Sequence, residues 1–154
     1  MTSPLQSSNL NIFSLGLFDF NKKSDEAMDF RFEQRFDKKI FDLGPAEEPL
    51  YIISPFYSIE ITSDSAIYAL GGIFVEEKIS KSFYITPSFG AGFFSKGDGK
   101  DLGGSIEFRS TLELSYEMKS KNRIGISWGH ISNANLGNKN PGVEILSLSY
   151  QTSF

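Results

Sequence analysis

The segment SIEFRSTLELSYEMK, from Ser105 to Lys119, alternates between two kinds of side chain with a period of two. Its apolar positions are mostly even-numbered, and its charged positions are odd-numbered: Ile106, Phe108, Leu112, Leu114, Tyr116 and Met118 against Glu107, Arg109, Glu113 and Glu117. Successive side chains of a β-strand point to opposite faces, so the segment predicts a strand with one apolar and one charged face.

Seven further runs of the same kind surround this segment. The eight runs lie near residues 9–19, 27–37, 50–62, 66–78, 81–94, 104–119, 123–132 and 143–154. Turn-forming residues separate them, and the longer stretch 37–48 is expected to be a connection. Eight sequential strands predict an all-β fold, an eight-stranded antiparallel up-and-down barrel. We expect one domain over residues 1–154, with 1–8 as a loose N-terminal end.

The alternation alone does not say which face is inside. Three features favour a transmembrane barrel with its apolar face toward lipid. The runs reach the roughly 9–11 residues that a tilted membrane strand requires. The apolar face is rich in Phe, Tyr, Leu and Ile, and 14% of all residues are aromatic. Opposite charges two residues apart, such as Glu107 with Arg109, suit a narrow lumen in which charges pair. The alternative is a soluble, lipocalin-like barrel or sandwich with its apolar face inside.

Composition excludes several kinds of site and partner. The 154 residues contain no cysteine and one histidine, His130, which excludes disulfides, thiolate zinc sites and multi-histidine metal sites. The net charge of −4 gives no basic footprint, so no nucleic-acid partner is expected. No apolar run approaches the ~18 residues of a membrane helix. No signal peptide is visible, which fits a cytoplasmic protein or a mature exported chain equally.

Three polar residues interrupt the apolar face where the last two runs meet. His130 and Ser132 continue the parity of Trp128, and Glu144 has the apolar parity of the final run. Pairing through the loop is expected to place Glu144 beside Ser132 or diagonal to His130. Serine as nucleophile, histidine as general base and glutamate to orient the imidazole are the components of a serine hydrolase. The alternative is that the three residues have no catalytic role: His130 is a surface or interfacial residue, Ser132 begins a turn, and Glu144 is a charged loop residue.

The loop between these runs adds a resemblance to a known family. His130-Ile131-Ser132-Asn133-Ala134, followed by Leu136, Asn140, Gly142 and Glu144, resembles the C-terminal signature of the lipid A 3-O-deacylases, the PagL family. Supporting similarity extends upstream through residues 86–90, 97–103 and 107–109.

This resemblance implies an eight-stranded outer-membrane barrel that hydrolyses the 3-O ester-linked acyl chain of lipid A. It implies Ser132 as nucleophile, His130 as base and Glu144 as the third member, without metal or cofactor. Asn140 matches the family's oxyanion asparagine. A family glycine whose backbone amide would complete the oxyanion hole falls on Asn135 here, which puts the loop conformation in question because Asn adopts a positive φ less readily than Gly.

The expected strand topology agrees with a site that acts on lipid A in the outer leaflet. With the N-terminus on the periplasmic side, the seventh run ends and the eighth begins on the outer side, so the site faces the outer leaflet. The expected partners are lipid A or lipopolysaccharide as substrate and outer-membrane lipids, with a homodimer as a candidate assembly. Lys96 and Lys100 of the loop 95–103 are candidate headgroup contacts. A non-catalytic structural or adhesive outer-membrane barrel is the alternative function.

Overall fold

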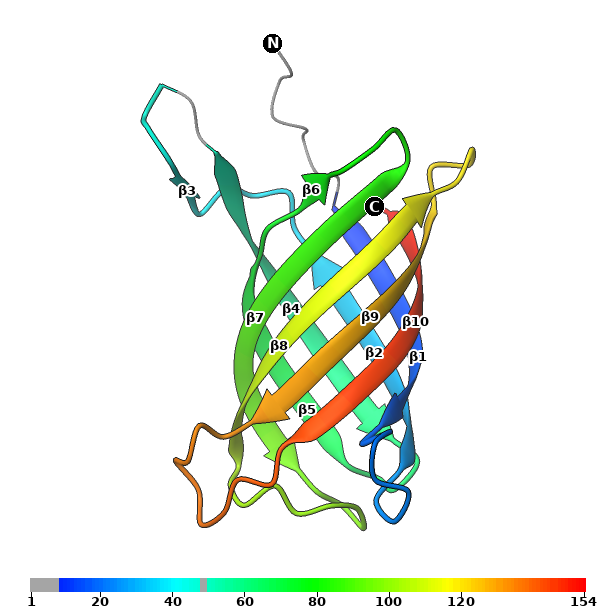
Figure 1. The fold of residues 1–154 in the computed structure, drawn as a ribbon, viewed down its shortest axis with the longest axis vertical. Coiled ribbons are helices and arrows are strands. Elements are labelled where there is room, and N and C mark those ends of the chain that lie inside the picture. Colours follow the sequence, from blue (N-terminus) through cyan, green and yellow to red (C-terminus); the bar gives the residue numbers. More distant parts are fainter. Residues whose placement is uncertain (1–8, 48–49) are drawn as a thin grey trace.

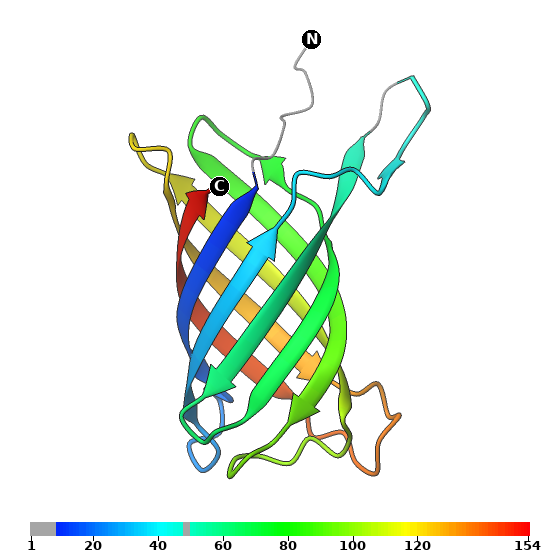
Figure 2. The same ribbon diagram turned by 180° about the vertical axis from the view of Figure 1, so that it is seen from behind.

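The computed structural model describes residues 9–47 and 50–154, and its strands form a closed antiparallel barrel (Figures 1 and 2). The expected loose end at residues 1–8 lies outside the described residues. The strands are β1 Leu10–Phe18, β2 Ala27–Arg35, β3 Phe41–Leu43, β4 Tyr51–Thr62, β5 Ile67–Phe74, β6 Glu77–Lys78, β7 Phe83–Ser95, β8 Ile106–Glu117, β9 Arg123–Ser132 and β10 Val143–Ser153. Within these residues no helix is long and apolar enough to cross a membrane.

Eight of the strands make the wall, which confirms the predicted barrel. Their order around the wall is β2-β1-β10-β9-β8-β7-β5-β4, and pairing of β2 with β4 closes it. The first and last wall strands pair from Leu10 opposite Ser153 to Phe18 opposite Ile145. β1 begins and β10 ends at one end of the barrel, and the loop between β9 and β10 lies at the other end (Figure 1).

Two short strands depart from the predicted runs. β3 falls in the stretch that was expected to be a connection, and it pairs with the start of β4. The run 66–78 is split into β5 and β6, which both pair with β7 in one continuous register. The break lies beside Pro87, whose carbonyl accepts a bond from the Val75 N–H. Proline has no N–H, so it cannot donate the reciprocal bond to Val75, and the ladder is interrupted there.

The apolar faces of the wall strands point outward. In β8, Leu112, Leu114 and Tyr116 are exposed, whereas Glu107, Arg109 and Glu113 are buried. This confirms the predicted orientation, which is that of a barrel surrounded by lipid. The soluble lipocalin-like alternative is wrong, because its apolar face would have to line the interior.

Ion pairs fill the middle of the lumen. Arg109 of β8 contacts Glu33 of β2 at 2.7 Å and Glu60 of β4 at 2.9 Å. Arg35 of β2 contacts Glu113 of β8 at 2.8 Å. β2 and β8 lie four strands apart on the eight-stranded wall, so these pairs cross the lumen. Buried charges require such partners, and here they tie opposite walls together.

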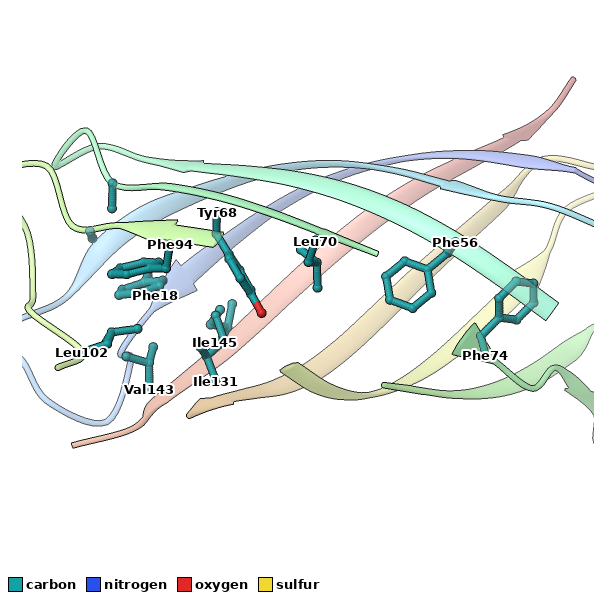
Figure 3. Close-up of a cluster of buried hydrophobic side chains, with 12 residues drawn as sticks. Phe18, Phe56, Tyr68, Leu70, Phe74, Phe94, Leu102, Ile131, Val143 and Ile145 are labelled. Atoms are coloured by element: carbon teal, nitrogen blue, oxygen red, sulfur yellow. The ribbon is translucent and has the colours of Figure 1, made fainter. Parts of the chain in front are cut away.

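A cluster of buried apolar side chains lies along the lumen, and most of its members, including Phe18, Tyr68 and Phe94, lie near the end that carries the loop between β9 and β10 (Figure 3). The Phe18 and Phe94 rings stack with centroids 6.4 Å apart, and Tyr68 meets Phe94 edge-on. Leu102, from the loop between β7 and β8, is buried in the same cluster. Ile131 of β9 and Val143 and Ile145 of β10 belong to this cluster. The residues next to them in the chain point to the outer surface of the barrel.

Candidate functional site

The three polar residues of the candidate site lie at the loop ends of β9 and β10. Ile131 and Val143 point into the barrel and are almost completely buried, at 0% and 1% exposure. Since side chains alternate along a strand, His130, Ser132 and Glu144 point outward. Each of these three is partly exposed. The structure thus places them on the outer surface, at the end of the barrel opposite the start of β1 and the end of β10.

The strand register differs from the expected one. Glu144 lies directly opposite His130, rather than beside Ser132 or diagonal to the histidine. A shift of two residues leaves every side chain on the same face, so the apolar pattern does not distinguish these registers. The ladder begins at Val143 opposite Ile131, because Gly142 has a φ of 65° and lies outside the strand.

This register brings the imidazole and the carboxylate into contact. His130 Nδ1 lies 2.5 Å from Glu144 Oε1, and their side chains are 44% and 23% exposed. A carboxylate accepts hydrogen bonds, so Nδ1 carries the proton, and in the neutral ring Nε2 is then the basic nitrogen. Glu144 Oε2 also accepts a bond from Trp128 Nε1 at 2.7 Å. The glutamate therefore fixes the tautomer and the orientation of the ring.

Ser132 follows on the same face of β9. It lies opposite Phe108 of β8, whose ring stacks on Phe89 with centroids 6.0 Å apart. Across residues 9–47 and 50–154, no hydrogen bond joins the Ser132 hydroxyl to the imidazole. Contacts of this kind often tighten only when substrate binds. An aromatic pair thus lies on the strand next to Ser132.

Gly142 limits the position of the imidazole from the loop side. A Cβ at this position would lie 3.1 Å from His130 Cε1 and 3.8 Å from Nε2. The positive φ of Gly142 also suits glycine better than any other residue. Glu144 thus bonds to Nδ1 of the ring, and a side chain at position 142 would contact its Cε1.

The loop 133–142 is held by its own asparagines. Asn133 is buried, and its Nδ2 donates to Leu102 O and Lys139 O at 2.8 and 2.7 Å. Its backbone N–H donates to Asn140 Oδ1 at 3.1 Å. Asn140 Nδ2 donates in turn to Asn135 Oδ1 at 3.3 Å. The Asn133 N–H needs an acceptor, so the side-chain oxygen of Asn140 faces it. The Asn140 NH₂ group is therefore the end that donates to Asn135.

Asn135 adopts the conformation that a glycine would favour. Its φ is 63°, and that of the preceding Ala134 is 52°. Asn is among the residues that enter this region most readily after Gly. The replacement of the family glycine by Asn135 is therefore compatible with a left-handed turn next to Ser132.

The expectation that Lys100 contacts headgroups is wrong. Its side chain is 9% exposed, and its ammonium lies 2.5 Å from Asp19 and 3.1 Å from the Gly142 carbonyl. Lys100 thus ties the loop between β7 and β8 to the turn after β1 and to the loop before β10. Nearby, the Gly103 N–H and the Lys139 ammonium hold the pKa of Asp101 below its ordinary value.

Sequence reasoning missed two contacts of this site. The sequence places Trp128 only on the apolar face, and Lys100 only in a loop. The parity of Trp128 with His130 was visible in the sequence, but its bond to Glu144 depends on the register. In the described part of the chain, no group of three or more His, Cys, Asp or Glu residues is arranged to hold a metal ion.

Comparisons with known proteins point to one family. The family model described as lipid A 3-O-deacylase (PagL) matches residues 47–153. A protein named lipid A deacylase PagL from Bordetella bronchiseptica is 35% identical over 74 residues, which are 47% of this chain and 42% of the relative. This match therefore spans less than half the length of that curated relative.

Solved structures agree on the fold. The crystal structure of the outer membrane enzyme PagL aligns with a TM-score of 0.68 and 18% identity, over 94% of this chain and 99% of the other. A de novo designed transmembrane β-barrel aligns with a TM-score of 0.62 and 11% identity, over 98% and 100% of the two chains. The second match shows that the barrel architecture does not by itself specify a function.

Proposed function

Since this chain belongs to the lipid A 3-O-deacylase (PagL) family, we propose that it hydrolyses the 3-O-linked acyl ester of lipid A in the outer leaflet of the outer membrane. The observation that carries the proposal is the outward-facing contact between His130 and Glu144, with Ser132 next on the same strand face. Ionisable groups on a lipid-facing surface are costly and are retained mainly for function.

Ser132 is the nucleophile in this proposal. His130 Nε2 takes the hydroxyl proton as Ser132 Oγ forms a bond to the ester carbonyl carbon. The His130 ring becomes a cation, and the Glu144 carboxylate at Nδ1 stabilises it. When the tetrahedral intermediate collapses, the bond to the sugar oxygen breaks and Nε2 returns the proton to that oxygen. The acyl group is left on Ser132.

Water completes the cycle by the same route. His130 takes a proton from water, the hydroxide oxygen bonds to the acyl carbon, and the bond to Ser132 Oγ breaks as Oγ regains a proton. The products are a free fatty acid and a lipid A with a free 3-hydroxyl group. These steps need only acid–base chemistry by the named side chains.

Asn140 and Asn135 form the proposed oxyanion hole. Asn140 Nδ2 carries two N–H groups, and one of them donates to Asn135 Oδ1. The other is assigned to the oxyanion of the tetrahedral intermediate. The backbone N–H of Asn135, in the left-handed turn three residues after Ser132, is assigned as the second donor.

The position of the site suits an ester at the membrane surface. The three side chains lie where β9 ends and β10 begins, and exposed apolar residues continue from them toward the middle of the barrel: Leu112, Ile126, Leu146 and Leu148. An acyl chain lying on this apolar face places its ester at the strand ends. Lipid A and the surrounding lipids are the proposed partners. A homodimer is a candidate assembly, which sedimentation in detergent would test.

The test is hydrolysis by the purified barrel. Lipid A incubated with the protein in mixed micelles should lose one acyl chain, and mass spectrometry should find the released fatty acid. Ser132→Ala should lower the rate at least about 10³-fold while the barrel still folds, because the hydroxyl faces outward. No hydrolysis by the folded wild type would instead favour a non-catalytic barrel. Undiminished hydrolysis by Ser132→Ala would exclude this nucleophile.

A further inference from the structure

The carboxylate of Glu144 is held at both oxygens. Oε1 contacts His130 Nδ1 at 2.5 Å, and Oε2 accepts a bond from Trp128 Nε1 at 2.7 Å. Trp128 lies two residues before His130 on the outward face of β9 and directly opposite Leu146 of β10. Its indole N–H therefore reaches diagonally from one strand to the other.

Two donors at opposite oxygens fix the plane of a carboxylate. With the histidine bond alone, the Glu144 side chain could rotate about that bond and still keep it. The second oxygen would then lack the bond from the indole N–H that now holds it. The tryptophan N–H removes this freedom, because the planar ring allows a bond in one direction only.

We infer that Trp128 is a positioning residue of the site, which acts by orienting Glu144 and through it the imidazole of His130. This inference rests on the proposed function. A tryptophan on the outer surface of a barrel commonly anchors it at the membrane interface, where aromatic residues form girdles. Only the indole N–H makes the bond to Glu144, so the two roles separate when that single group is removed.

The first variant is Trp128→Phe, which keeps an aromatic ring and removes the donor. We expect kcat to fall about tenfold with little change in KM, since a hydrogen bond to a charged group has about that effect. The matched control is Tyr150→Phe, on the same outward face but far from the site, which loses only a bond from Asn122. This control should leave kcat unchanged.

A double variant tests whether Trp128 acts through Glu144. In the Glu144→Ala background, Trp128→Phe should cause no further loss, because the group that it orients is absent. An additional tenfold loss in that background would overturn the inference and indicate that Trp128 acts on the substrate or on packing. Wild-type kcat in Trp128→Phe alone would also overturn it.

Substitution of the indole covers the case in which Trp128→Phe fails to fold. Trp128 is the single tryptophan of the chain, so biosynthetic replacement of tryptophan by benzothienylalanine changes this position alone. The analogue keeps the bicyclic shape and has sulfur in place of N–H, and the same tenfold loss of kcat is expected. Ser132→Ala is measured in parallel. If that variant is inactive while the analogue is fully active, only this inference fails; if Ser132→Ala is active, the proposed mechanism fails.

Discussion

Removal of the Lys100 ammonium should loosen the loops that hold the site. Lys100→Met keeps the aliphatic stem and removes the contacts to Asp19 at 2.5 Å and to the Gly142 carbonyl at 3.1 Å. Asp19 is 1% exposed, so its carboxylate would stay buried without its cation. Breaking a buried pair in this way costs about 3–5 kcal/mol. We expect about 3 kcal/mol, because the loops can open toward water and relieve part of the penalty.

Denaturant unfolding of the barrel refolded into lipid vesicles measures this cost, with gel mobility and the fluorescence of Trp128 as readouts. The control is the double variant Lys100→Met with Asp19→Asn, which leaves no unpaired charge and should recover most of the lost stability. A loss below about 1 kcal/mol for Lys100→Met, or no recovery in the double variant, would refute the reasoning. Hydrolysis should fall together with stability, since Lys100 also bonds to the carbonyl of Gly142, two residues before Glu144.

Three further predictions concern the loop and the outer face. Asn140→Ala should lower kcat roughly 10²–10³-fold with little change in KM, and Asn140→Asp should be worse because it sets a negative charge beside the oxyanion; if Asn140 only accepts the loop bond, the order of the two variants is reversed. Gly142→Ala should lower kcat about tenfold in a folded barrel, because its Cβ would press on His130 Cε1 from 3.1 Å, and unchanged kcat would show that the ring tolerates displacement. Leu112→Arg should cost about 2–4 kcal/mol of folding into bilayers, whereas Ser120→Arg in the exposed turn after β8 should cost close to zero; equal costs would contradict the lipid-facing orientation.

The alternation of apolar and polar residues was sufficient to predict the strands of the wall and which face of each strand points outward. A shift of the strand register by one residue would turn Glu107 and Arg109 toward lipid. The pattern therefore strongly specifies their inward orientation. The same pattern could not fix the pairing of Glu144 with His130, because a shift of two residues preserves both faces. That pairing depends on where a ten-residue loop returns to the sheet, which the left-handed Gly142 and the buried Val143 determine in the folded chain.

The remaining differences have equally local causes. The break between β5 and β6 follows from the missing N–H of Pro87. This proline lies in β7, the strand that pairs with both β5 and β6. The partner of Lys100 lies 81 residues away along the chain, and no sequence pattern identifies such a contact. The outward placement of His130 and Ser132 was visible from parity alone. The contact of Trp128 with Glu144 was not, because it requires the register.

The filled interior has a consequence for how such an enzyme would meet its substrate. Crossed ion pairs and aromatic and aliphatic side chains occupy the lumen, so the proposed hydrolysis would take place at the outer wall of the barrel. Substrate would then arrive, and fatty acid depart, by lateral diffusion within one leaflet. The turnover rate should follow the mole fraction of lipid A among the surrounding lipids rather than its bulk concentration. Diluting the substrate with inert lipid at constant total substrate should slow the reaction, as expected for catalysis confined to two dimensions.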